Sequence, residues 1–138
     1  MKKKKILIVD DDVGLTYLLR EYLQRKSDFE VLEENDSRHA VDTAKQVMPD
    51  LILLDVIMPH VDGGEVAARL SANAATNRIA IVFLTGVVQR SEVDDHGGMI
   101  GGYPFISKPI DFDSFLPSLE NVLASSGSCT GEPVQVAL

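Results

Sequence analysis

The chain has no tryptophan, a single cysteine and no long hydrophobic run. Cys129 alone cannot form an internal disulfide bond, and a membrane-spanning helix needs about 20 consecutive apolar residues. The basic start, residues 1–5, is followed by only four apolar residues before Asp10, fewer than the ~7–15 of a signal-peptide core. These absences exclude a disulfide scaffold and a membrane span, and they predict a cytoplasmic protein.

Basic charge is also scarce, because 13 lysine and arginine residues face 21 acidic ones and the net charge is −8. Binding DNA or RNA depends on neutralising phosphates with basic side chains, so no direct nucleic-acid partner is expected. The only basic run, residues 2–5, is interpreted as a solvated chain end. The 138 residues, 45% of them hydrophobic and 25% charged, indicate one globular domain.

Short apolar runs rich in β-branched residues alternate with patterns of helical period. Strands are predicted at residues 6–9, 29–32, 51–54, 79–84 and 103–107, and helices at 15–23, 40–48, 64–72 and 115–123. Such alternation is typical of an α/β fold, a parallel sheet with right-handed crossovers and helices on both faces. Residues 1–124 are predicted to form the domain, and residues 125–138, rich in Ser and Gly and without a period, a flexible tail or linker.

Three features near the end of the domain carry separate predictions. Pro104 cannot donate a ladder hydrogen bond, so the strand at 103–107 is expected at a sheet edge. Asp113 is expected to cap the last helix, which would leave Pro117 near its first turn. The four glycines within residues 89–102 predict a short or loose helix there.

Chemically active side chains follow the predicted strands at their carboxyl ends, where open parallel sheets form their sites. The second strand is followed by nothing comparable. The other four are followed, in chain order, by Asp10, Asp11 and Asp12, by Asp55, by Thr85 and by Lys108.

Several carboxylates at one rim repel one another unless a cation or protons offset them. Carboxylates without histidine or cysteine partners suit a hard ion such as Mg²⁺, which takes one or two carboxylates together with phosphate oxygens. The Thr85 hydroxyl and the Lys108 ammonium are suited to bind phosphoryl oxygens. The set predicts a phosphoryl-transfer site in which one aspartate is the nucleophile.

Four motifs together resemble the receiver domain of two-component response regulators, over about residues 4–124. They are Val9-Asp10-Asp11, Asp55 with Met58-Pro59 and Gly63, Thr85-Gly86, and Lys108-Pro109. The resemblance implies a flavodoxin-like, doubly wound, five-stranded parallel sheet of strand order 2-1-3-4-5. It also implies a signalling switch with no enzymatic activity beyond self-catalysed phosphorylation and dephosphorylation of an aspartate.

The resemblance also implies a role for each matching residue. Asp55 would be the phosphoacceptor, Thr85 would reorient towards the phosphoryl group, and Lys108 would pair with it. Phe105 would be the switch aromatic, and Pro109 would fix its loop through a cis peptide bond. The Mg²⁺ ligands would be Asp10, Asp11, Asp55 and the backbone carbonyl of Ile57.

The implied partners are a sensor histidine kinase or histidine phosphotransfer protein as donor, and a downstream protein target or output domain. A phosphorylation-linked dimer is a further implication. The signal would be read on the face made by the fourth helix, the fifth strand and the fifth helix. No membrane partner is implied.

Alternatives remain at this point. One residue of the Asp10–Asp12 run is expected to cap a helix, since acidic residues favour that position. A haloacid-dehalogenase-like phosphatase using Asp10 would explain the Asp-x-Asp pattern, but it needs a second acidic set after Lys108 and leaves Asp55 without a role. A flavin-binding module is disfavoured by three negative charges in the first loop. A receiver-like scaffold that is never phosphorylated also stays open.

Overall fold

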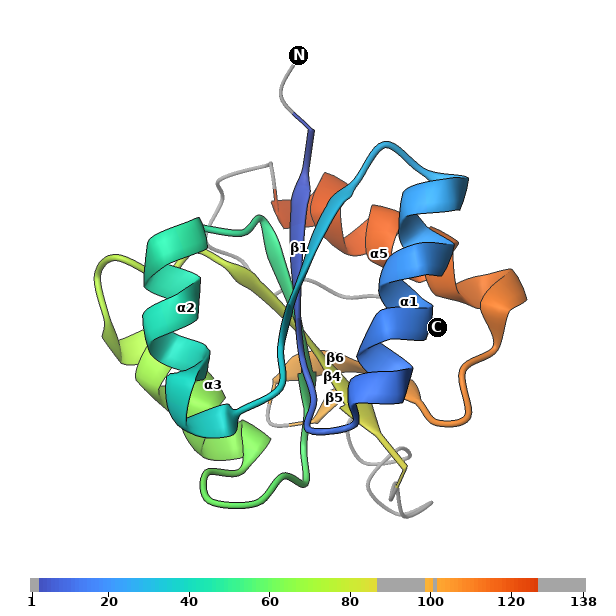
Figure 1. The fold of residues 1–138 in the computed structure, drawn as a ribbon. Coiled ribbons are helices and arrows are strands. Elements are labelled where there is room, and N and C mark those ends of the chain that lie inside the picture. The colour runs from blue at the N-terminus through green and yellow to red at the C-terminus, as the bar shows by residue number, and fades with distance from the viewer. Residues whose placement is uncertain (1–2, 87–98, 101, 127–138) are drawn as a thin grey trace.

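The computed structural model describes residues 3–86, 99–100 and 102–126 as a sheet covered by helices (Figure 1). The predicted alternation of strands and helices is observed in these residues. The elements in chain order are β1 (Lys5–Val9), α1 (Val13–Lys26), β2 (Glu30–Glu34), the 3₁₀ helix η1 (Ser37–His39), α2 (Ala40–Val47), β3 (Leu51–Asp55), α3 (Gly63–Ala72), β4 (Ala80–Thr85), β5 (Met99–Ile100), β6 (Tyr103–Ser107) and α5 (Phe112–Ser126).

Five strands run parallel in the order β2-β1-β3-β4-β6, which confirms the predicted order 2-1-3-4-5. The sheet also contains a short strand that was not predicted. The two residues of β5 pair antiparallel with the outer side of β6, Met99 opposite Pro104 and Ile100 opposite Tyr103. β6 is therefore the outermost parallel strand, and a two-residue addition extends the sheet beyond it.

The two faces of the sheet each bury a separate hydrophobic core, because side chains alternate along every strand. In β1, Ile6 and Ile8 belong to the core beneath α1 and α5, whereas Leu7 and Val9 belong to the core beneath α2 and α3. Figure 1 shows these two helix pairs on opposite sides of the sheet. The strands are apolar throughout because both of their faces are covered.

Aspartates cap the N-termini of the two helices α1 and α3, which follow β1 and β3. Asp12 caps α1 by accepting a hydrogen bond from the backbone N–H of Leu15 at 3.1 Å. Asp62 caps α3 by accepting one from the N–H of Glu65 at 2.8 Å. Each cap satisfies a backbone donor that has no partner within the helix. Asp12 is thus the capping member expected within the run of three aspartates.

The predicted start of the last helix is wrong. α5 begins at Phe112, and Asp111 accepts a hydrogen bond from the N–H of Asp113, so Asp113 already lies in the first turn. Pro117 consequently lies inside the helix, beyond its first turn. The apolar period marked the buried face of α5 from Phe115 onwards, but it left out Phe112, which packs against the same core one turn earlier and begins the helix.

Some predictions fall on residues that the structure does not describe. The short or loose helix was expected within residues 89–102, of which residues 89–98 and 101 lie outside the described residues, as do residues 127–138 of the predicted tail. Among the described residues, no helix is both long and apolar enough to cross a membrane.

Candidate functional site

The side chains predicted to form a site come together at the carboxyl ends of the parallel strands. Asp10 follows β1, Asp55 and Thr85 are the last residues of β3 and β4, and Lys108 follows β6. Asp10 is 1% exposed and Asp55 6% exposed, and Thr85 is buried as well. Two buried carboxylates at one sheet edge are costly unless a positive charge accompanies them.

Lys108 supplies a positive charge between the two aspartates. Its Nζ lies 2.7 Å from Asp10 Oδ2 and 3.4 Å from Asp55 Oδ1. The backbone N–H of Lys108 donates to the carbonyl of Thr85 at 2.8 Å, which joins the ends of β6 and β4. The peptide bond between Lys108 and Pro109 is cis, as predicted.

The charges at the site shift the pKa values of two groups. Burial, followed by the negative charge of Asp10, raises the pKa of Asp55 to about 6, although Lys108 opposes the shift. Burial disfavours the charged form of Lys108, but its hydrogen bond and attraction to Asp10, together with Asp55, outweigh this and raise the Lys108 pKa. The ammonium therefore stays charged, and it does not fully offset the two carboxylates.

Three carboxylates are close enough to share one cation. One oxygen each of Asp10, Asp11 and Asp55 lies within 4.8 Å of the others, with Asp11 on the exposed side. These groups offer only oxygen ligands, and their combined negative charge is larger than the single positive charge of Lys108. The donor set therefore fits Mg²⁺, which prefers carboxylates and water. Ile57, the residue whose backbone carbonyl was predicted as a further ligand, lies on the loop after β3, two residues beyond Asp55. It is 63% exposed.

The loop after β3 is shaped by close backbone packing. A Cβ atom on Gly63 would lie 2.2 Å from the carbonyl oxygen of Asp55, so only glycine fits there. The N–H of Gly63 donates to the carbonyl of Val56 at 2.8 Å, and the Met58 side chain is buried beneath the loop. Gly63 and Met58 of the motif thus have a structural reason, because Gly63 packs against the backbone of Asp55 and Met58 anchors the loop in the core.

Phe105 lies in β6 opposite Phe83 of β4 and is buried in the core beneath α2 and α3. Its ring therefore occupies an inward position in this structure. Tyr103, on the same strand, packs edge-on against Phe83, with ring centroids 5.6 Å apart. The switch role of Phe105 remains a prediction.

A residue at the end of β2, which was not predicted from the sequence, also contacts the site. Asn35 follows β2 directly, and its side-chain amide donates to the backbone carbonyl of Asp10 at 2.8 Å and to Thr16 Oγ1 at 2.9 Å. The second strand was predicted to end at residue 32, whereas β2 ends at Glu34. With the strand end at Glu34, Asn35 would have been predicted at the same edge of the sheet as Asp10, Asp55, Thr85 and Lys108.

A doubly wound parallel sheet with buried aspartates and a lysine at its carboxyl edge is the arrangement expected of a receiver domain. The model of the family described as "Response regulator receiver domain" matches residues 6–120, most of the chain. The chain therefore belongs to the response regulator receiver domain family. Receiver domains are the phosphorylation-dependent switches of two-component phosphorelays, and the match assigns the chain to this class rather than to haloacid-dehalogenase-like phosphatases.

Individual relatives agree with the family match. Protein PilH of Pseudomonas aeruginosa is 31% identical, over 87% of this chain and 98% of its own length. The probable transcriptional regulator ycf29 of Pyropia yezoensis is 34% identical over 87% of this chain, which spans only 53% of that relative. The solved structure of Vibrio cholerae chemotaxis protein CheY4 has a TM-score of 0.76 and 25% identity, covering 88% of this chain and 99% of that one.

Proposed function

We propose that Asp55 is the phosphoacceptor of this receiver domain and takes a phosphoryl group from a phosphohistidine. The observation that carries the proposal is the position of its carboxylate, buried at the end of β3 beside Asp10 and 3.4 Å from Lys108 Nζ. One oxygen of Asp55 attacks phosphorus, and the bond from phosphorus to the donor nitrogen breaks. The product is an acyl phosphate on Asp55 and a free histidine on the donor.

Asp10, Asp11 and Asp55, with the backbone carbonyl of Ile57, would hold Mg²⁺, the expected cofactor. When bound, this ion offsets negative charge on the carboxylates and on the phosphoryl oxygens. Asp12 is used in capping α1 and stays outside the ligand set. Asn35 holds the backbone of Asp10, so the first loop needs little rearrangement to bind the ion.

Lys108 and Thr85 act on the phosphoryl group itself. The Lys108 ammonium already lies beside Asp55 and pairs with a phosphoryl oxygen once the carboxylate is phosphorylated. Thr85, at the end of β4, turns its hydroxyl towards a second oxygen. Phe105 moves in concert, and Pro109 keeps the Lys108 loop in place. The only chemistry assigned to the domain is this self-catalysed phosphorylation and the hydrolysis of the acyl phosphate, in which water attacks phosphorus, inorganic phosphate leaves and the Asp55 carboxylate is restored.

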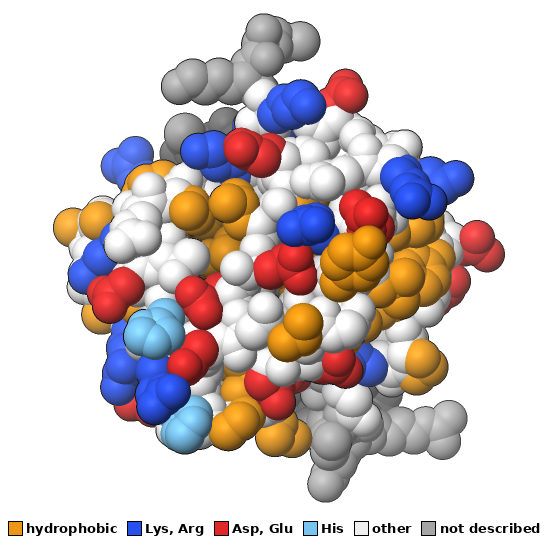
Figure 2. Space-filling model, viewed as in Figure 1, with side chains coloured by type: hydrophobic (Ala, Val, Ile, Leu, Met, Phe, Trp, Pro, Cys, Tyr) orange, Lys and Arg blue, Asp and Glu red, His pale blue; other side chains and the backbone are white. Residues whose placement is uncertain are grey.

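Exposed hydrophobic side chains lie next to the site and suit a protein donor, a sensor histidine kinase or a histidine phosphotransfer protein. Val13, Tyr17 and Leu18 of α1 are exposed, as is Ile57 after β3. Figure 2 shows hydrophobic side chains gathered over the region of α1. A docked partner would bury them and bring its phosphohistidine to Asp55.

The output is a change in binding to a downstream protein or output domain, with a phosphorylation-linked dimer as one form. In this proposal residues 1–124 form the receiver domain and residues 125–138 a tail or linker, whose first two residues still belong to α5. The protein acts in the cytoplasm without membrane or nucleic-acid partners. The net charge of −8 supports the absence of a nucleic-acid partner.

The first test is the intact mass of the protein after incubation with Mg²⁺ and acetyl phosphate. The unsubstituted protein is expected to gain one phosphoryl group, and Asp55→Asn is expected to gain none. Asp12→Asn is the matched control, because it alters an adjacent aspartate that caps α1 without joining the ligand set. Chelating Mg²⁺ should abolish the gain in the unsubstituted protein.

Failure of phosphorylation would be examined with beryllofluoride, a stable phosphate mimic. If the protein neither gains mass nor changes its amide NMR signals at Thr85 and Phe105 with beryllofluoride and Mg²⁺, the proposal is wrong. The fold would then serve as a scaffold.

A further inference from the structure

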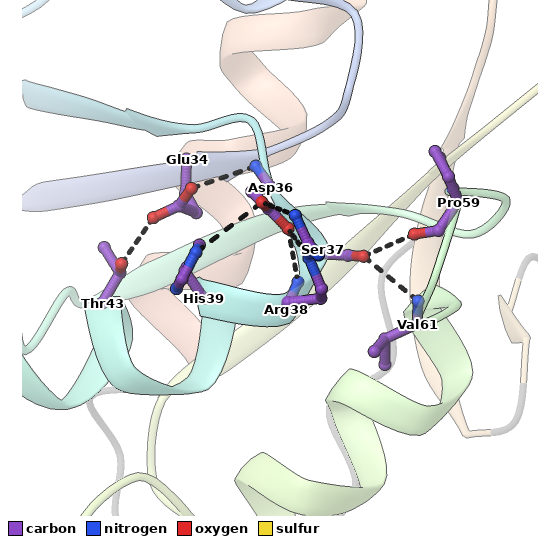
Figure 3. Close-up of polar contacts among 8 residues, drawn as sticks. All are labelled: Glu34, Asp36, Ser37, Arg38, His39, Thr43, Pro59 and Val61. Atoms are coloured by element: carbon purple, nitrogen blue, oxygen red, sulfur yellow. Dashed lines mark hydrogen bonds and ion pairs between the residues drawn. The ribbon is translucent and has the colours of Figure 1, made fainter.

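The connection between β2 and α2 touches both loops of the candidate site. Ser37, the first residue of η1, is 5% exposed. Its hydroxyl donates to the carbonyl of Pro59 at 2.6 Å and accepts from the N–H of Val61 at 3.2 Å (Figure 3). Pro59 and Val61 belong to the loop that carries Ile57, so a residue outside the known motifs holds that loop from the side.

The two contacts of Ser37 flank the strained residue of this loop. His60 has a φ of 74°, in the left-handed region that side chains other than glycine rarely adopt. The N–H of Val61 donates to the carbonyl of Pro59 at 2.9 Å across it, closing a three-residue turn. A left-handed residue other than glycine is strained, and it persists where surrounding contacts enforce it. Ser37 supplies two such contacts.

Asn35 holds the other loop of the site, the one between β1 and α1 that carries Asp10 and Asp11. Its amide spans the carbonyl of Asp10 and the hydroxyl of Thr16, a fully buried residue of α1. The N–H of Asp10 donates to the carbonyl of Glu34 at 3.2 Å. The end of β2 thus fixes the backbone of Asp10 from both its donor and its acceptor side.

We propose that Asn35 and Ser37 are positioning residues that set the Mg²⁺ affinity of the site by holding its two ligand loops. This inference rests on the proposed function, because it assumes that these loops bind the ion. The residues bind no metal themselves. They fix the groups that do, and loss of such outer contacts typically weakens metal binding 10–100-fold.

Neighbouring polar contacts provide a control within the same connection. Asp36 pairs with Arg38 at 2.8 Å, and Thr43 Oγ1 donates to Glu34 Oε1 at 2.6 Å (Figure 3). Among the contacts of the described residues, the side chains of these two pairs reach neither ligand loop, and Glu34 contacts Asp10 only through its backbone carbonyl. A change at Thr43 therefore disturbs the connection between β2 and α2 without releasing the loops.

The experiment compares Ser37→Ala, Asn35→Ala and the control Thr43→Val with the unsubstituted protein. The Mg²⁺ dissociation constant is measured by titration calorimetry, and phosphorylation by acetyl phosphate is measured at saturating Mg²⁺. Mg²⁺ affinity is expected to fall about tenfold or more in the two alanine variants and less than twofold in the control. Phosphorylation at saturating Mg²⁺ should fall much less than the affinity, because the reacting groups are unchanged.

A backbone readout separates positioning from a general loss of structure. In the Mg²⁺-free protein, Ser37→Ala should shift the amide NMR signals of Ile57, Met58, His60 and Val61, and Asn35→Ala should shift those of residues 10–12. Thr43→Val should shift neither set. If Ser37→Ala does not fold, Ser37→Cys replaces it, since a thiol keeps the size and is only a weak hydrogen-bond donor.

The possible failures are distinguishable. If the unsubstituted protein binds no Mg²⁺, the proposed function fails. If it binds Mg²⁺ and becomes phosphorylated while the folded alanine or cysteine variants bind Mg²⁺ as tightly as Thr43→Val, the inference is overturned and the proposed function stands.

Discussion

Gly63 lies closer to the backbone of Asp55 than any other amino acid could. Its missing side chain lets the start of α3 pack on the carbonyl of Asp55, where a Cβ atom would be at 2.2 Å. The obstructing atom is backbone, so it cannot turn aside as the end of a long side chain can. The geometry of β3 at Asp55 therefore depends on one hydrogen atom in place of a methyl group.

Gly63→Ala is expected to destabilise the protein by about 3 kcal/mol or more, because the backbone of Asp55 or of α3 must shift. Denaturant unfolding measures the change. Gly64→Ala is the matched control, since its Cβ would meet only the Asp62 side chain at 3.4 Å. Alanine also favours the helix there by roughly 0.5–1 kcal/mol. Equal stability of the two variants would contradict the packing argument.

Helix α5 departs most clearly from the sequence prediction among the elements. It begins at Phe112, and the exposed Pro117 lies in its interior. Proline has no N–H to donate to the carbonyl one turn earlier, and its ring crowds that carbonyl. α5 tolerates this because Phe115, Leu119 and Val122 are buried against the sheet. Tertiary packing outweighs the local cost of the proline.

Pro117→Ala is accordingly expected to stabilise the protein by about 1–3 kcal/mol, since it restores one helix hydrogen bond at an exposed position. Thermal unfolding checks this as a rise in the midpoint temperature. Glu120→Ala, at another exposed position of α5, should change the stability by less than about 0.5 kcal/mol. A lower midpoint for Pro117→Ala would mean that the proline sets a bend the fold needs.

At the scale of the whole molecule, the fold concentrates negative charge at one sheet edge and loses stability there. The pKa of Asp55 is about 6 in the folded state against an ordinary value of 3.8. The folded protein therefore binds this proton more tightly than the unfolded chain does. The resulting stabilisation is present below about pH 4 and is lost as the pH rises through 6.

Asp55→Asn removes the charge that causes this loss. Without divalent ions, the variant is expected to exceed the unsubstituted protein in free energy of unfolding by up to about 3 kcal/mol above pH 7. The difference should shrink towards zero near pH 4. Denaturant unfolding across this range measures it, and Mg²⁺ should stabilise only the unsubstituted protein. A difference that does not depend on pH would show that the Asp55 charge is not its cause.

The strands and the placement of the main site residues were predictable because they depend on local patterns. Apolar runs such as residues 51–54 have no polar face, so they indicate strands covered on both sides. Parallel strands then bring Asp10, Asp55, Thr85 and Lys108 to one edge, whatever the details of the loops. The boundaries were less predictable, because Glu33 and Glu34 extend β2 without any apolar signal.

The sequence by itself determined the fold class, the strand order expected from the family and the side chains that meet at the sheet edge. Only the tertiary structure decided what holds those side chains in place. Asn35 and Ser37 contact loops that lie 22 to 25 residues away in the chain. Such contacts leave no periodic trace in the sequence, since they depend on where separate loops meet in space. The pKa of Asp55 likewise depends on burial and on charges brought together only by folding.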